Sequence, residues 1–277
     1  MEEPIRTLKV GATGINIINI GDVQEDLRQW FGLSEAELAA NPLFEQPARL
    51  PIQSIYIAAP GMSVLVDAGL YDYPPDAPQL IPGYQPPPDL FAQLAAINVD
   101  PATINHVIIT HAHGDHFNAL TETHDGQTQI KFPNARHYVG RADWEAAQKA
   151  LTDPNSLESR TLGVLHQQGL LELVEHPRDL GSGIQIIPAP GESPGHQIVR
   201  VYSEGETLYC LGDLYHLVAE VENPKWVLRW TNGEANQRSR QAFNEQALKE
   251  DARLVATHIA PVGRLARTAT GYTWVAV

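Results

Sequence analysis

Short apolar runs, several of them alternating with polar residues, recur along the whole chain and predict the strands of a partly buried sheet. We expect strands at residues 15–20, 52–57, 63–66, 106–110, 135–139, 184–188, 197–202, 207–211, 253–257 and 272–277. Helical periodicity and cap residues separate these runs. We expect helices at residues 25–31, 89–97, 117–123, 141–151 and 237–251. A further helix is expected between Ser34, with Glu37 three residues on as in a capping box, and the stop at Asn41-Pro42.

Hairpins and β-then-α stretches alternate in this pattern, which indicates an α/β or α+β sandwich. No repeat, low-complexity tract or clear linker divides the sequence, so residues 1–277 are expected to form a single domain. The early stretch 25–44 carries Trp30 and Phe44. It predicts either a helical pair packed on the core, or a loop that roofs a pocket or contacts a second subunit. Residues 71–88 are crowded with proline and tyrosine and predict an irregular surface loop.

The amino-acid composition limits where the protein is expected to act and which kinds of molecule it is expected to bind. The chain has 277 residues, 43% of them hydrophobic, and is long enough to bury a core without cross-links. No apolar segment approaches the length of a membrane span, and the first residues do not resemble a signal peptide. Cys210 is the only cysteine, so a reducing compartment, the cytoplasm, is expected. The net charge of −14 disfavours nucleic acid and anionic membranes, and the expected partner is a small, neutral or weakly charged molecule.

Metal-capable side chains gather directly after one apolar run. His111, His113, Asp115 and His116 lie within six residues and follow the predicted strand at 106–110. Open sheets place their sites at the C-terminal ends of strands. Imidazole and carboxylate together suit zinc or a similar first-row divalent ion. The sequence therefore predicts a metal site, unless the histidines are scattered structural residues.

Three further candidate ligands follow other predicted strands, namely His196, Asp213 and His258. Since each lies where an apolar run gives way to a loop, they can converge with the first cluster at one sheet edge. Five histidines and two aspartates suffice for two metals that share a carboxylate, and this recurrence argues against the scattered alternative. Two nearby groups have simpler roles. Asp67 is expected to cap or brace a turn rather than to be catalytic, and Cys210 to be a buried packing residue rather than a thiolate ligand.

Taken together, these motifs resemble the signature of the metallo-β-lactamase superfamily. The resemblance rests on His-Ala-His-Gly-Asp-His at 111–116, Pro-Gly-His at 194–196, Gly-Asp at 212–213, Thr-His at 257–258 and Val-Leu-Val-Asp-Ala-Gly at 64–69. It implies a four-layer αββα sandwich with a dinuclear metal site between the two sheets. It also implies the ligands: one ion takes His111, His113 and His196, the other takes Asp115, His116 and His258, and Asp213 bridges them. Two zinc ions are expected, with manganese, cobalt and iron as alternatives.

Within that superfamily, the chain is most similar to the branch of methyl parathion hydrolase and the N-acyl homoserine lactonases. The similarity lies in the interval of roughly eighty residues from His116 to His196, in Phe-Pro-Asn-Ala at 132–135 and in the ending at 271–277. Phe-Asn-Ala follows the histidine cluster where that branch has Gly-Gly, and Ala-Pro-Val at 260–262 replaces its Pro-Phe-Pro. Because these departures lie near the pocket, they leave the substrate open.

The resemblance implies a homodimeric hydrolase in which a metal-bridging hydroxide attacks the substrate. Lactones of the quorum-quenching type are the leading substrates, with phosphotriesters as a main or side reaction. A thioesterase of the glyoxalase II kind and a mononuclear-iron sulfur dioxygenase are the alternatives. The presence of Asp115, His116 and His258 argues for two metals and so against the dioxygenase.

Other residues near the motifs are candidates for direct roles. Asp115 is expected to orient the nucleophile as well as bind metal. Tyr215 and His216, just beyond Asp213, are candidates to donate a proton or bind the substrate's oxygen, although both could equally be packing groups. Three aromatic residues are candidate pocket walls or core residues by sequence proximity alone: Phe117, Trp226 and Trp230.

Overall fold

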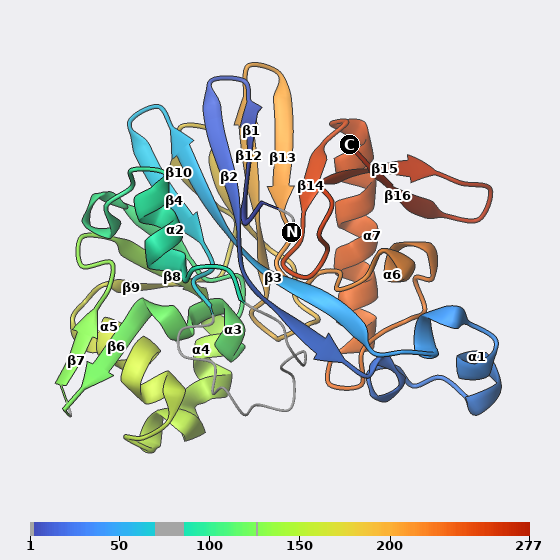
Figure 1. The fold of residues 1–277 in the computed structure, drawn as a ribbon, viewed down its shortest axis with the longest axis horizontal. Coiled ribbons are helices and arrows are strands. Elements are labelled where there is room, and N and C mark those ends of the chain that lie inside the picture. The colour runs from blue at the N-terminus through green and yellow to red at the C-terminus, as the bar shows by residue number, and fades with distance from the viewer. Residues whose placement is uncertain (1–2, 70–85, 126) are drawn as a thin grey trace.

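The computed structural model of the chain describes residues 3–69, 86–125 and 127–277. Two large β-sheets lie face to face and helices cover their outer sides (Figure 1). Most of the irregular loop expected at 71–88 falls outside the described residues.

Among the described residues, the strands form two seven-stranded sheets and one two-stranded sheet. The first sheet has the order β1 (Ile5–Val10), β2 (Thr13–Glu25), β3 (Ala48–Ala59), β4 (Met62–Val66), β5 (His106–Ile108), β8 (Arg136–Gly140) and β9 (Leu171–Val174). The second has the order β10 (Arg178–Gly181), β11 (Ile184–Pro188), β12 (Gln197–Ser203), β13 (Glu206–Cys210), β14 (Arg253–Val255), β15 (Gly263–Arg267) and β16 (Tyr272–Ala276). The two-stranded sheet pairs β6 (Thr121–His124) with β7 (Gln127–Ile130).

The helices complete a four-layer αββα sandwich, which confirms the expected fold class. They are α1 (Glu35–Ala39), α2 (Leu90–Ala96), α3 (Gly114–Phe117), α4 (Arg141–Ala146), α5 (Val164–Gln167), α6 (Val218–Glu222) and α7 (Gly233–Lys249). In Figure 1, α2, α4 and α5 lie on the left of the strands and α7 on the right. Leu94 of α2 packs in one apolar cluster with Leu65 of β4, and Phe243 of α7 packs in another with Ile198 of β12.

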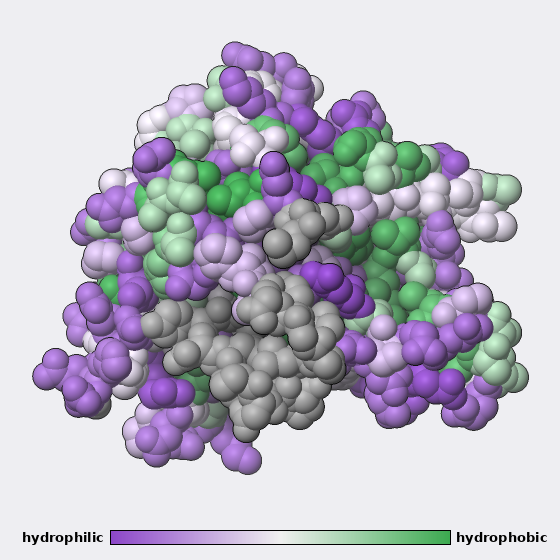
Figure 2. Space-filling model, viewed as in Figure 1, coloured by the Kyte–Doolittle hydropathy of each residue, from purple (hydrophilic) through white to green (hydrophobic). Residues whose placement is uncertain are grey.

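Period-two alternation explains why both sheets can be covered on two faces. In β4, Val64 and Val66 point into the cluster between the sheets, whereas Leu65 points to the outer cluster under α2. In β12, Val199 points between the sheets and Ile198 points toward α7. A strand buried on both faces has no polar side, so its sequence is a continuous apolar run. In the space-filling view, hydrophilic side chains cover much of the rim of the molecule (Figure 2).

Near the N-terminal end, two of the expected elements differ from the structure. The first long strand does not end at residue 20, because β2 continues to Glu25 through a register shift between Asn19 and Gly21. The helix expected at 25–31 is only a 3₁₀ turn, Leu27–Gln29, which is capped by the side chain of Asp26. The capping box of Ser34 and Glu37 is present at the start of α1, as predicted.

The helix expected at 117–123 is also largely wrong. Residues Asn118–Leu120 form a 3₁₀ turn, and from Thr121 onward the chain pairs as β6 with β7. The helix that does form, α3, begins earlier, inside the histidine cluster. Within the described part of the chain, no helix has both the length and the apolar composition that crossing a bilayer demands.

Candidate metal centre

The predicted ligands come from strand ends that meet at one edge of the sandwich. The His111–His116 segment follows β5, Asp213 follows β13, and His258 follows β14. The pairs β4–β5 and β13–β14 are parallel, so the carboxyl ends of their strands point to the same edge. This arrangement brings segments far apart in the sequence to one place between the two sheets.

Asp67 fixes the first ligand segment. Its backbone adopts a left-handed conformation (φ 58), which aspartate tolerates better than most residues. Its carboxylate accepts hydrogen bonds from the Thr110 amide (2.7 Å) and hydroxyl (2.9 Å), and lies 2.9 Å from Nδ1 of His116. The bracing role expected for Asp67 is therefore confirmed. Because Nδ1 of His116 is held in this way, its Nε2 faces the other candidate ligands.

The two later histidines are oriented by main-chain carbonyls. Nδ1 of His196 lies 3.1 Å from the Ala189 carbonyl, and Nδ1 of His258 lies 2.9 Å from the Pro51 carbonyl. Burial lowers the pKa of His196 to about 3, which keeps its ring neutral. Neutral imidazole is the form that binds a metal, so the ring of His196 is prepared for that role.

Asp213 lies between two groups of ligand atoms. Its Oδ2 is 3.7 Å from Nε2 of His111, and 3.3 Å from Nε2 of both His116 and His258. A turn at Gly212 presents this carboxylate, and a β-carbon there would lie only 2.6 Å from the Thr110 hydroxyl. Glycine is therefore required at this close approach, and its φ of 52 also favours glycine.

Two sets of donor atoms could each hold one ion, and they share Asp213. In the first, Nε2 of His111 lies 2.8 Å from Nδ1 of His113. In the second, Oδ2 of Asp115 lies 3.5 Å from Nε2 of both His116 and His258. Compact groups in which each ligand atom lies within 4.8 Å of the others are His111 with His113, Glu192 and Asp213; Asp115 with His116 and His258; and Asp213 with His216 and His258.

The chemistry of the site fits divalent ions. Oδ1 of Asp213 is buried and has no hydrogen-bond partner among the described residues, and a cation would satisfy it. The ring of His196 lies 5.2 Å from that of His111, and its Nε2 lies 3.2 Å from the Asp213 amide. The structure thus brings all seven sequence-predicted ligands to one centre.

The two candidate proton donors have different placements. His216 is buried against the centre, with Nε2 3.1 Å from Oδ2 of Asp213 and its ring stacked on that of His258 at 5.4 Å. Burial alone would lower the pKa of His216, but the Asp213 and Glu192 carboxylates outweigh it and raise the pKa to about 9. Tyr215 instead points into the cluster beside α7, where its hydroxyl donates to Oδ1 of Asn244 (2.9 Å), and it does not line the cavity at the centre.

A cavity of about 870 Å³ opens onto the centre. Its apolar wall consists of Val23, Leu50, Ile52, Trp30 and Trp230. The early stretch 25–44 therefore roofs the pocket through Trp30 and also packs on the core through Phe44. Of the three aromatic wall candidates, only Trp230 lines the cavity. The other two follow the core alternative: Phe117 is fully buried under the first sheet, and Trp226 packs against Phe44.

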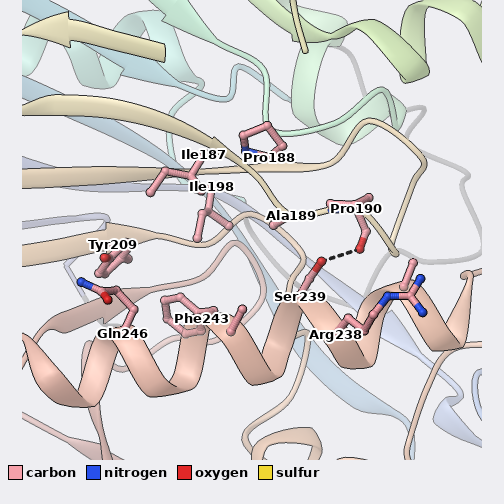
Figure 3. A pocket seen from close by; sticks show the side chains of 12 residues that line it. Ile187, Pro188, Ala189, Pro190, Ile198, Tyr209, Arg238, Ser239, Phe243 and Gln246 are labelled. Carbon is pink, nitrogen blue, oxygen red and sulfur yellow. Dashed lines mark hydrogen bonds between the residues drawn. The ribbon is translucent and has the colours of Figure 1, made fainter. Parts of the chain in front are cut away.

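A second cavity, of about 330 Å³, lies between α7 and strands β11 and β12 (Figure 3). Ile187, Ile198 and Phe243 form its apolar side, and Ser239 closes one end by donating to the Pro190 carbonyl (2.7 Å). Its lining, among the described residues, contains no histidine or carboxylate. This second cavity therefore offers none of the metal-capable side chains found at the first.

Two carboxylates at the centre are not evident from the sequence. Asp143, on α4, ties the loop of the histidine cluster to the loop before His196 by accepting hydrogen bonds from the Ala112 and Gly195 amides. Glu192 lies in that second loop and approaches His113, with Oε1 3.6 Å from its Nδ1. The only sequence signal for Glu192 is its position four residues before His196, and the sequence offers no signal for Asp143.

Comparisons with known proteins agree with this geometry. The sequence profile of the metallo-beta-lactamase superfamily matches residues 48–258. The chain is 30% identical over 142 residues to N-acyl homoserine lactonase AttM of Azorhizobium caulinodans, and this match covers 46% of the chain and 47% of the relative. The matched region is thus about half the length of that relative.

Solved structures show the same fold. AidC, described as a dizinc quorum-quenching lactonase and solved with a product bound, superposes with a TM-score of 0.79 at 19% identity, over 99% of this chain and 97% of that one. AbOPH, a hydrolase of the beta-lactamase superfamily, superposes with a TM-score of 0.80 at 16% identity, over 100% of this chain and 98% of that one. At these identities the likeness establishes the fold alone.

Proposed function

Since the chain belongs to the metallo-β-lactamase superfamily, we propose that it is a hydrolase that uses two divalent metal ions to open lactones. The observation that carries the proposal is the position of Asp213 between two sets of metal-capable side chains. A single structural ion would not require a second set of donors around one shared carboxylate.

The residues present would hold the ions in two groups. His111 and His113, with His196 beside them, would hold one, Asp115, His116 and His258 the other, and Asp213 would touch both. When bound, such ions polarise a carbonyl or phosphoryl oxygen and make water available as a nucleophile at neutral pH. Nitrogen and oxygen donors suit zinc, which we propose as the native metal, and they also accept manganese, cobalt or iron.

The protein's own groups position the reactants. Asp67 holds the ring of His116, and two main-chain carbonyls hold His196 and His258, so little reorganisation accompanies the reaction. His216 lines the cavity beside Asp213 and is placed to contact an oxygen of the substrate. We assign Asp115 the role of orienting the attacking water by a hydrogen bond. We assign Tyr215 a packing role, because its hydroxyl bonds Asn244.

The cavity supports a neutral substrate with an apolar part. Trp30, Trp230 and Leu50 offer an apolar wall, whereas Glu25 and Glu192 would repel an anion. The similarity to AttM favours a lactone. We propose phosphotriesters as a second activity, because ions that polarise a carbonyl oxygen also polarise a phosphoryl oxygen. We further propose that the protein is cytoplasmic, because its single cysteine suits a reducing compartment. We also propose that it is a homodimer, because Trp230, beside the early stretch 25–44, is exposed.

The two alternative activities differ from a lactonase in the number of metal ions required or in the bond that is cleaved. A sulfur dioxygenase needs one iron, and the second donor set argues against it. A thioesterase of the glyoxalase II kind would use the same centre on a thioester, so substrates must separate it from a lactonase.

The test is hydrolysis of a panel of lactones, an aryl phosphotriester and a thioester, before and after removal of metal. We expect chelation to abolish lactone hydrolysis and zinc, cobalt or manganese to restore it, with two ions per chain by elemental analysis. His113→Ala should lose metal and activity, whereas Cys210→Ser, a fully buried position away from the donors, should retain both. Lactone hydrolysis that persists in fully metal-free protein would refute the proposal.

A further inference from the structure

Glu192 is a buried carboxylate that faces the metal centre from the loop between β11 and β12. Its relative exposure is 3%, and its Oε1 accepts a hydrogen bond from Nε1 of Trp230 (2.7 Å). The same oxygen lies 3.6 Å from Nδ1 of His113 and 3.8 Å from Nε2 of His216. The other oxygen, Oε2, is buried and has no hydrogen-bond partner among the described residues.

These distances match those between ligands of one ion. Two donor atoms that each lie about 2.1 Å from a tetrahedral ion are separated by about 3.4 Å. The 3.6 Å between Glu192 and His113 is close to this value. Moreover, one atom each from His111, His113, Glu192 and Asp213 all lie within 4.8 Å of one another. An ion that contacts the first two histidines is therefore within reach of Glu192.

Burial makes a structural role alone costly for this side chain. A buried carboxylate without adequate partners is destabilising by several kcal/mol. One indole hydrogen bond, together with His216 at 3.8 Å, beyond hydrogen-bond distance, satisfies only part of that need. A divalent ion beside it would supply the missing partner. Asp213, the next carboxylate, cannot do so, because its like charge repels that of Glu192.

We propose that Glu192 is a ligand of the ion held by His111 and His113, so that three carboxylates rather than two bind the metal pair. The inference rests on the dinuclear centre of the proposed function and adds a donor to it. A third carboxylate lowers the formal charge of the loaded site by one unit. It also shifts the donor set of one ion toward oxygen, and oxygen donors favour manganese relative to zinc more than imidazole does.

The experiment measures metal binding directly, in the full chain, by elemental analysis and by competition with a chromogenic chelator. Glu192→Gln keeps the size of the side chain and removes its charge. We expect it to keep one ion with the affinity of the parent, and to raise the dissociation constant of the other at least about tenfold, more for Mn²⁺ than for Zn²⁺. Glu192→His should restore the affinity for Zn²⁺ but not that for Mn²⁺.

Two control variants separate a ligand from a positioning residue. Trp230→Phe removes the indole donor and leaves the carboxylate, so we expect its dissociation constants within about threefold of the parent. Glu245→Gln makes the same change on the exposed face of α7 and should have no effect. Visible spectra of the cobalt-loaded proteins report the coordination of the ion, and they should change in Glu192→Gln only.

Each outcome bears on one proposal. If Glu192→Gln binds two ions with the affinities and the cobalt spectrum of the parent, Glu192 is not a ligand. If Trp230→Phe weakens binding as much as Glu192→Gln does, the carboxylate acts only through the indole and the inference is likewise wrong. If the parent itself binds no ions, the proposed function fails first. Unfolding of the metal-free variants checks that each one is folded.

Discussion

Asp143 offers the sharpest test of how this fold holds its candidate metal centre, because it touches no predicted ligand side chain. Its buried carboxylate, 2% exposed, accepts hydrogen bonds from the Ala112 amide (2.9 Å), the Ser193 hydroxyl (2.8 Å) and the Gly195 amide (2.6 Å). Ala112 lies between two predicted ligands, and Gly195 immediately precedes a third. One carboxylate on α4 therefore fastens two ligand loops that are about eighty residues apart in the sequence.

The size of the effect follows from these three bonds. A hydrogen bond to a charged group contributes about 1.5–3 kcal/mol, and a buried donor left without a partner costs about 1–3 kcal/mol. Asp143→Ala leaves two main-chain amides without a hydrogen-bond acceptor, whereas the Ser193 hydroxyl can turn to another partner. We expect the free energy of unfolding to fall by roughly 3–5 kcal/mol, and about half as much for Asp143→Asn, which keeps one acceptor oxygen.

The second expected effect is on the metal. Because the loops that carry His111, His113 and His196 lose their common anchor, metal affinity should fall by about 10–100-fold, as it does when groups that orient ligands are removed. Urea unfolding in the presence of chelator measures the first effect, since bound metal would stabilise the fold by mass action. Chelator competition measures the second.

Glu145→Ala is the matched control, because Glu145 lies on the same helix and is exposed. If Asp143→Ala unfolds within about 1 kcal/mol of this control and binds metal with the parent's affinity, the carboxylate does not organise the centre, and the reasoning from its hydrogen bonds is wrong.

Two further predictions concern the fold around the centre. Burial lowers the pKa of His137 from 6.5 to about 4. Between these two pH values the unfolded chain is protonated at this residue and the folded chain is not. The free energy of unfolding should therefore fall by roughly 3 kcal/mol as the pH drops from 6.5 to 4. Urea unfolding at several pH values should show that His137→Leu loses this part of the pH dependence, and an unchanged profile would contradict it. A β-carbon at Gly195 would lie 2.5 Å from the Asp143 main-chain nitrogen, so Gly195→Ala should destabilise the protein by roughly 1–3 kcal/mol, whereas Gly32→Ala, which meets open space, should not. Equal melting temperatures for these two glycine variants would count against the close approach.

Sequence reasoning failed where neighbours in space overrode local preference. Residues 117–123 carry helix-compatible side chains, but pairing of Thr121 onward with β7 makes the stretch a strand. The end of β2 was misplaced for the same reason, since pairing with β3 carries it past Gly21 to Glu25. In both cases the partner strand lies outside the local window, so no propensity within the window could reveal it.

The aromatic residues illustrate the same limit for the site. Trp226 and Trp230 are four residues apart, yet one packs against Phe44 and the other lines the cavity. Tyr215 and His216 are adjacent, yet one bonds Asn244 and the other approaches Asp213. Side-chain direction depends on the local backbone and on what packs around it, and neither can be read from the identity of the residue.

The sequence by itself determined the strands that are apolar on both faces, and the seven predicted ligands at strand ends. Apolar periodicity and a cluster of imidazoles are local patterns, so both can be read from the sequence. Tertiary structure alone decided that Asp143 anchors two ligand loops and that Glu192 turns toward His113. These contacts join segments separated by 31 to 79 positions along the chain, counting from Ala112 to Asp143 and from His113 to Glu192. Their partners are chosen by how the two sheets stack, and that stacking is the sum of many weak apolar contacts rather than a property of any one stretch.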